Sequence, residues 1–181
     1  NSVRKRTANL VSWLQRAKPD VVVLQELKAQ EPQFPKLEVE AAGYKVEMVG
    51  QKGFNGVALL SLHPVEITAR ALPDAVADEP ARYIEGKVQT PRGPLTVGGI
   101  YLPNGNPQPG PKFDYKLRWM DLLAERIEAL TRGFDEKVMA ILGSVAKAGT
   151  DMQGIAQAMV GKAMRHPLRA AGILRHRPLC P

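Results

Sequence analysis

The sequence predicts a mixed α/β protein in which helices cover β-sheets, and three observations support this class. Short apolar runs alternate with amphipathic segments between Leu10 and Leu60. Two later runs are joined by the tight turn Pro91-Arg92-Gly93, as expected of a β-hairpin. A long segment with helical spacing of its apolar residues follows the hairpin.

The first two elements are an amphipathic helix and a buried strand. Leu10, Trp13, Leu14 and Ala17 recur at helical spacing, and the helix must stop at Pro19. Residues 21–25 begin with four consecutive apolar side chains, whose exposure would be costly. We therefore expect this strand to lie inside a sheet.

The remaining elements follow from similar patterns. We expect a short helix at residues 37–42 and strands near 44–48, 57–60, 65–71, 82–89 and 95–101. Residues 102–111 are rich in proline and form a loop long enough to be a candidate functional loop. An amphipathic helix then ends near Gly133, and residues 138–142 form a last buried strand.

Composition favours a cytoplasmic protein with one core, or part of a larger one. The chain has 181 residues, 44% of them hydrophobic, without a bilayer-spanning run or a secretion signal. Its only cysteine, Cys180, cannot form an internal disulfide. The net charge is +7, of which residues 144–181 supply +5, from six basic residues and one acid. This basic tail either binds nucleic acid or is a solvated end.

Polar side chains follow three of the expected strands. Glu26 ends the first, Tyr101 and Asn104 follow the sixth, and Ser144 follows the last. Strand ends tend to converge on one crevice, where a carboxylate is well placed to hold a hard cation. Three of these residues also have a structural interpretation: Glu26 caps a loop or pairs with Lys28, Tyr101 is a core aromatic, and Asn104 is a turn residue.

Several segments together carry a resemblance to a known family. Residues 1–6, 18–26, 50–60, 81–84, 101–105 and 112–113 resemble exodeoxyribonuclease III, within the endonuclease/exonuclease/phosphatase superfamily. They occur in the family's order and spacing over the greater part of the chain. The Gly-Gln-Lys-Gly turn at residues 50–53 and the Tyr-x-Pro-Asn-Gly loop at 101–105 are specific to that subgroup.

The resemblance implies a fold, a reaction and a partner. The fold is a four-layer α/β sandwich of two mixed sheets flanked by helices. The reaction is hydrolysis of DNA phosphodiesters in DNA repair, as a 3′-to-5′ exonuclease and an abasic-site endonuclease. It depends on Mg²⁺, with Mn²⁺ as an alternative ion. The partner is double-stranded DNA, including abasic sites and 3′ ends, and the protein is expected to act as a monomer.

The resemblance also implies roles for individual residues. Glu26 matches the metal-binding glutamate, and Tyr101 matches a catalytic-site tyrosine near the scissile phosphate. Asn104 matches an amide that hydrogen-bonds a phosphate. The basic residues Arg82 and Lys112 match contacts to the DNA backbone, while Lys52 and Asn55 lie in a DNA-facing turn. Such contacts position a duplex without reading its sequence.

The match breaks down at residue 144. Ser144 and Ala146 stand where the family has an aspartate and an asparagine, although Asp151 keeps the spacing of a later aspartate. A serine cannot accept the proton of an attacking water at neutral pH, so we expect catalysis to fall by orders of magnitude.

The family's first strand would precede Asn1, and its second half has no counterpart before Pro181. We therefore expect residues 1–143 to form the N-terminal half of a nuclease domain and residues 144–181 a divergent basic tail. The alternative is a non-catalytic or decayed remnant that at most binds DNA through Lys52, Arg82, Lys112 and the tail, which is either genuine or the product of a shifted reading frame.

Overall fold

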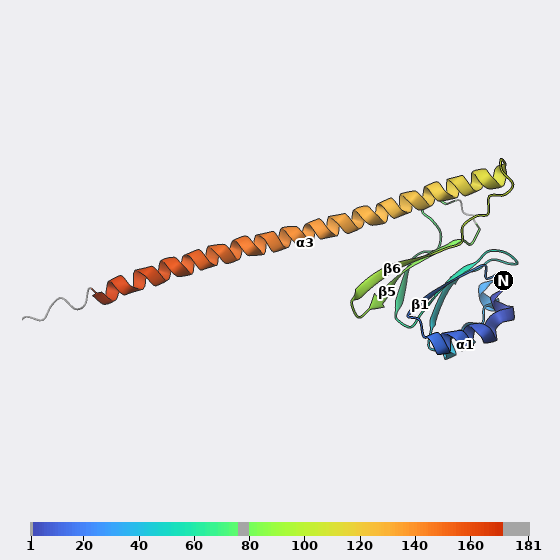
Figure 1. The fold of residues 1–181 in the computed structure, drawn as a ribbon, viewed down its shortest axis with the longest axis horizontal. Helices are drawn as coiled ribbons and strands as arrows, with labels where there is room; N and C mark the ends of the chain where they lie inside the picture. Colours follow the sequence, from blue (N-terminus) through green and yellow to red (C-terminus); the bar gives the residue numbers. More distant parts are fainter. Residues whose placement is uncertain (1, 76–79, 172–181) are drawn as a thin grey trace, which may run out of the picture. The chain divides into compact units, whose positions relative to one another are not determined.

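The computed structural model describes residues 2–75 and 80–171, with side chains as far as residue 163. The chain divides into two compact units, Asn1–Ile127 and Glu128–Pro181. The first unit contains both β-sheets and the short helices, and the second contains the continuation of one long helix (Figure 1). The predicted boundary at residue 143 stays a prediction.

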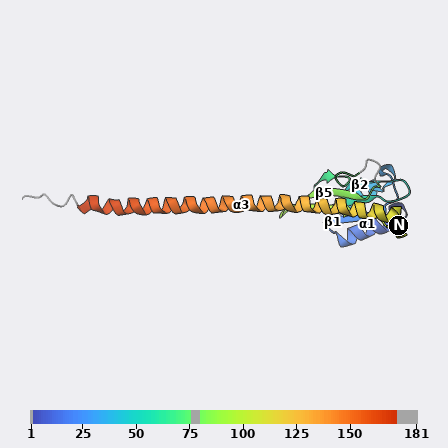
Figure 2. The same cartoon turned by 90° about the horizontal axis from the view of Figure 1, so that it is seen from above.

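The first sheet has three antiparallel strands in the order β1-β3-β2, with β1 at Val21–Gln25, β2 at Lys45–Val49 and β3 at Val57–Ser61. Helices α1 (Thr7–Ala17) and α2 (Lys36–Ala41) cover one face, where Leu14 and Val39 join the sheet's buried side chains in one cluster. Figures 1 and 2 both show α1 beside β1. Short 3-10 helices, η1 (Val3–Arg6) and η2 (Glu31–Gln33), precede α1 and α2.

The second sheet, β4-β5-β6, packs on the other face of the first. Its strands are β4 (Val65–Ala69), β5 (Tyr83–Thr90) and β6 (Gly93–Ile100), and both strand pairs are antiparallel. Val57 and Leu59 of β3 meet Ile84 of β5 in a buried cluster between the two sheets.

The last layer of the first unit is the beginning of helix α3, which spans Pro111–Ala171. Trp119 of α3 packs on Tyr83 and Leu72 and is 1% exposed. Helices, sheet, sheet and helix therefore form four layers, which confirms the predicted class. Mixed sheets were expected, but all four described strand pairs are antiparallel.

We expected strand β1 to lie inside its sheet, but among the described strands it lies at the sheet's edge. It pairs with β3 alone among the described strands, and only Val22 of its residues is buried. Val22 faces the helices, whereas Val21 and Val23 pack toward the second sheet. The apolar run therefore indicates that both faces of the strand are covered by other layers. It does not indicate whether a neighbouring strand pairs with each of its two edges.

The predicted helix end near Gly133 and the predicted strand at residues 138–142 are both wrong, because α3 runs through them (Figure 1). No proline occurs between Pro111 and Pro167, and an isolated glycine weakens a helix without ending it. Ile141 and Leu142 are 63% and 56% exposed, so this segment lacks the covering layers that a buried strand needs.

No described helix is long and apolar enough to cross a membrane.

Candidate functional site

Glu26 lies in a strained loop that is clamped onto the turn at residues 50–56. Glu26 and Lys28 have φ angles of 56° and 53°, in the left-handed region that non-glycine residues rarely adopt. The Leu27 amide donates to the Gly56 carbonyl at 3.3 Å, and the Lys28 amide donates to the Asn55 carbonyl at 3.0 Å. A Cβ on Gly56 would lie 2.9 Å from Leu27 Cβ, so the close approach requires glycine. These contacts fix where the Glu26 side chain emerges.

The Glu26 carboxylate is paired with a cation of its own chain. Lys28 Nζ lies 3.2 Å from Glu26 Oε1, and both side chains are 32% exposed. Within the described residues, no group of three acidic, histidine or cysteine side chains could hold a metal ion. One carboxylate beside a competing ammonium does not fit a complete magnesium site, so metal binding by Glu26 stays a prediction.

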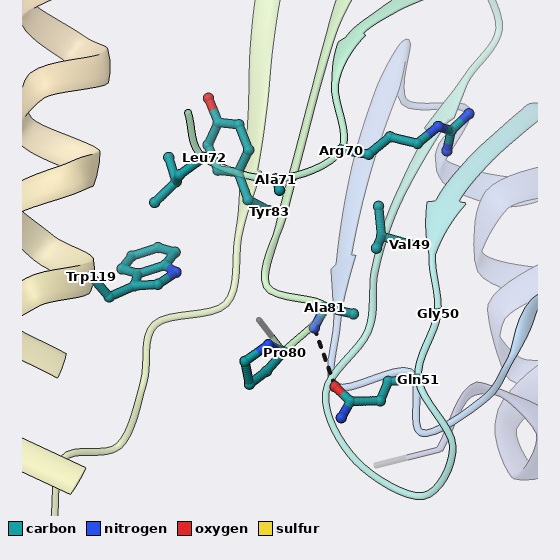
Figure 3. A pocket seen from close by; sticks show the side chains of 10 residues that line it. All are labelled: Val49, Gly50, Gln51, Arg70, Ala71, Leu72, Pro80, Ala81, Tyr83 and Trp119. Carbon is teal, nitrogen blue, oxygen red and sulfur yellow. Dashed lines mark hydrogen bonds between the residues drawn. The ribbon is translucent and has the colours of Figure 1, made fainter. Parts of the chain in front are cut away.

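Gln51 connects the same turn to the segment before Arg82. Its Oε1 accepts a hydrogen bond from Asn55 Nδ2 at 2.8 Å. The same oxygen accepts one from the Ala81 amide at 3.2 Å (Figure 3). The Gly56 amide also donates to the Ala81 carbonyl at 2.9 Å. Sequence reasoning assigned Lys52 and Asn55 to this turn and missed Gln51. Its partner Ala81 is distant in the sequence, so local sequence gave no signal of the contact.

Arg82 holds Tyr101 by two kinds of contact. The guanidinium carbon lies 4.9 Å from the centroid of the Tyr101 ring, within cation-π range. Arg82 Nη1 donates to the Tyr101 carbonyl at 3.1 Å, and the Tyr101 amide donates to the Arg82 carbonyl at 2.8 Å. Arg82 Nε is buried and has no hydrogen-bond partner among the described residues. The geometry thus ties together two residues that the sequence predicted separately.

The other predicted site residues are exposed. Lys52 lies in the turn, next to Gly53 and the 70% exposed Phe54. Asn104 accepts a hydrogen bond from Asn106 Nδ2 at 3.0 Å, and Lys112 lies in the first turn of α3. Contacts among described residues therefore join the Glu26 loop, Asn55, Arg82 and Tyr101, but they do not extend to Asn104 or Lys112.

The sequence predicted that Ser144 and Ala146 follow a strand, but both lie on α3 in the second unit. Both are exposed, and Ser144 Oγ donates to the Ala140 carbonyl at 2.9 Å. Asp151 lies on the same helix. The expectation that a third strand end would join those of Glu26 and Tyr101 is therefore wrong.

A hollow of about 280 Å³ lies beside the Gln51 turn (Figure 3). Its lining is about equally polar and apolar, with Leu72, Tyr83 and Trp119 on one side and Gln51 and Arg70 among the polar residues. The Gln51 carboxamide is engaged as described above, and Arg70 pairs with the Glu47 carboxylate at 2.7 Å and the Met48 carbonyl at 2.8 Å. The polar side chains Gln51 and Arg70 are thus hydrogen-bonded to neighbouring parts of the first unit.

A buried carboxylate, Glu85, links α3 to β5 through Arg126. Glu85 is 1% exposed and accepts hydrogen bonds from Thr68 Oγ1, Tyr83 OH and the Arg126 guanidinium at 2.5 to 2.9 Å. Burial alone would raise the pKa of Glu85, but these donors outweigh it and lower the pKa to about 2. Burial, together with the bond to Glu85, raises the pKa of Tyr83 to about 12. The network is charged and fully formed at neutral pH.

Comparisons with known proteins agree with this architecture. Residues 1–140 match the model of the endonuclease/exonuclease/phosphatase family. Over 105 residues the chain is 37% identical to exodeoxyribonuclease III of Haemophilus influenzae, a match that covers 58% of this chain and 39% of that protein. The chain therefore spans about two fifths of the length of this curated relative.

Solved structures give the same result. An AP endonuclease from Archaeoglobus fulgidus aligns with a TM-score of 0.62 and 34% identity, over 68% of this chain and 46% of that one. A 3′ phosphatase, NExo, from Neisseria bound to a product DNA hairpin aligns with a TM-score of 0.62 and 34% identity, over 73% and 50%. A 3′-5′ exonuclease from Neisseria meningitidis aligns with a TM-score of 0.62 and 33% identity, over 72% and 50%.

The family model covers more than three quarters of the chain and the whole of its two-sheet unit. The resemblance noted from the sequence is thereby confirmed, and the chain belongs to the endonuclease/exonuclease/phosphatase family.

Proposed function

We propose that this protein is a DNA phosphodiester hydrolase of the exodeoxyribonuclease III type whose hydrolysis is impaired in this chain by Ser144 and Ala146, and that the first unit supplies contacts to the DNA backbone. The observation that carries the proposal is the chain of contacts from the Glu26 loop through Asn55 and Arg82 to Tyr101. It joins four segments that are far apart in sequence and that resemble the family's substrate-binding motifs.

The basic residues of the first unit suit a polyanionic partner. Lys52 and Lys112 have exposed ammonium groups, and such groups bind phosphates without reading bases. Arg82 Nε is a buried donor without a described partner, which costs free energy until an acceptor satisfies it. A phosphate oxygen is an acceptor of the required charge, and Tyr101, stacked on the same guanidinium, would then lie beside that phosphate.

Glu26 is proposed as the residue through which a divalent cation, Mg²⁺ or Mn²⁺, contacts this chain. The cation would supply charge stabilisation at the phosphate when bound. In the described structure Lys28 neutralises Glu26 instead. The chain's own part is then to hold the duplex and orient its backbone, in repair of abasic sites and 3′ ends in the cytoplasm.

A second candidate function is DNA binding without hydrolysis. It is favoured by Ser144 and Ala146, which replace the aspartate and asparagine of the resembled motif and lie exposed on α3. Neither side chain can act as a general base at neutral pH. Under this proposal, the chain retains contacts to DNA and cleaves it slowly or not at all.

The binding part is tested by fluorescence anisotropy with a labelled duplex that contains one abasic site. Lys52→Gln should weaken binding and lower the magnitude of the salt slope by about 1, because one phosphate contact is lost. Lys45→Gln, the same change at an exposed lysine of β2, serves as the matched control. Equal weakening by both variants would show only non-specific attraction and would contradict the proposed interface.

A further inference from the structure

The second unit has a continuous apolar stripe along α3. Apolar residues recur at alternating intervals of four and three residues, which is a seven-residue repeat without interruption. The stripe consists of Val138, Val145, Met152 and Met159 at one position of the repeat and of Phe134, Ile141, Ala148 and Ile155 at the other.

Most of this stripe is exposed in the single chain. Phe134, Ile141, Val145, Met152, Ile155 and Met159 are each between 61% and 71% exposed. Isolated exposed apolar side chains are ordinary, but a contiguous row of them typically marks an interaction surface.

The period of the repeat indicates that the partner is another helix. An α-helix has 3.6 residues per turn, so a strict seven-residue repeat stays on one face only if the helix supercoils around a partner. Here the repeat extends over residues 134–159, almost four heptads, which is the length at which such patterns favour a coiled coil.

The positions that flank the stripe favour a second copy of this chain. From Leu142 to Ala158 they are Leu142, Ser144, Gly149, Asp151, Ala156 and Ala158, of which only Asp151 is charged. Two identical stripes can therefore approach without facing rows of like charge. The small flanking residues also allow the two backbones to come close together.

The area is sufficient for a stable pair. Removing roughly 80 Å² from each of the eight stripe side chains on two copies buries on the order of 1,300 Å², within the range of specific interfaces. Two copies alone therefore bury enough surface for a specific interface, without a different partner protein.

The helix itself needs such support. Gly133, Gly143, Gly149 and Gly154 interrupt it, each at a cost of about 1 kcal/mol relative to alanine. A Cβ at any of the four would meet nothing within 4 Å among the described residues, so no internal contact explains them. Long helices of moderate propensity draw most of their stability from packing, so helix formation and association should be coupled.

We propose that the stripe of α3 pairs with the stripe of a second copy, forming a two-stranded coiled coil that makes the protein a dimer. This proposal replaces the monomer expected from the sequence, and it is independent of the proposed action on DNA. Dimerisation brings two DNA-contacting units into one molecule.

The test is sedimentation equilibrium of the full chain over a range of concentrations, with far-ultraviolet circular dichroism of the same samples. The expected mass is twice the chain mass of 19.8 kDa at about 100 µM and falls on dilution, with a parallel loss of helical signal. A mass of one chain at every concentration would overturn the proposal.

Two pairs of variants distinguish association through the stripe from non-specific association through other exposed apolar residues. Ile141→Glu with Ile155→Glu places charges on the stripe and should leave only the single-chain mass. Met139→Glu with Val160→Glu adds the same charges at exposed apolar positions outside the stripe, 68% and 56% exposed, and should leave the dimer intact. If both pairs abolish association, or if the wild-type forms larger assemblies that neither pair changes, the proposed stripe is wrong.

The near-ultraviolet signal of buried Trp119 reports whether the first unit remains folded in each variant. If the glutamate pair alters the Trp119 signal, the double variant Ile141→Gln with Ile155→Gln repeats the comparison without adding charge. The dimer should again be lost, and a dimer that persists in a folded glutamine pair would contradict the proposal.

Discussion

The Arg82 guanidinium lies over the Tyr101 ring, 4.9 Å from its centroid, and also donates to the Tyr101 carbonyl at 3.1 Å. The two residues flank the hairpin formed by β5 and β6, with Arg82 directly before β5 and Tyr101 directly after β6. Because Arg82 holds both the ring and the backbone of Tyr101, the start of the proline-rich loop is fixed to the start of β5. A residue first predicted as a DNA contact thus also positions its neighbour.

Arg82→Met should show this positioning. It removes the stacked charge and the hydrogen bond while keeping a similar apolar length, so we expect a loss of about 1 to 2 kcal/mol in the free energy of unfolding. Urea unfolding measures the loss. Arg92→Met removes the same charge at the exposed hairpin tip and should have almost no effect. An equal loss in the two variants would mean that the Arg82 contacts contribute nothing.

Glu85 should make the first unit sensitive to acid. Its pKa is about 2 in the folded chain and near 4.5 in the unfolded one, so its contribution is complete above pH 4.5 and disappears as the pH falls through 2. We expect Glu85→Gln to cost about 3 kcal/mol at pH 7 and much less at pH 2.5. Urea unfolding at the two pH values measures this difference.

Glu66→Gln is the matched control, because Glu66 is an exposed acid on the adjacent strand β4. It should change stability little at either pH. A cost of Glu85→Gln that does not depend on pH would show that the carboxylate's charge is not the stabilising element.

Gly143→Ala tests the helix that replaced the expected strand. Gly143 has no neighbour within 4 Å of an added Cβ and lies in the interior of α3. Alanine should therefore increase the helical signal at 222 nm and stabilise α3 by about 1 kcal/mol. If residues 138–142 instead formed a strand followed by a glycine turn, the same change would lower stability.

The strands and helices of the first unit were largely predictable because each buries one or two apolar faces. The alternation of apolar and charged residues at 44–48 and the apolar run at 57–60 predicted strands that the structure has as β2 and β3. The position of β1 at an edge was not predictable, because an apolar run looks the same whether covering layers or paired strands surround it.

The candidate site was predicted residue by residue, but its connections were not. Gln51 bonds to Ala81 and Glu85 bonds to Arg126, both across long stretches of sequence and through polar contacts that leave no periodic pattern. At residues 138–142, a short apolar run fitted either a strand or a helix, and the absence of proline before Pro167 was the better guide.

The most direct test of the account is incision of a labelled duplex with one abasic site by the full chain, with and without Mg²⁺, on the same duplex used for binding. We predict salt-dependent binding without incision above the protein-free control, because Ser144 and Ala146 cannot supply the missing catalytic groups. Mg²⁺-dependent incision that is lost in Glu26→Gln would contradict the account.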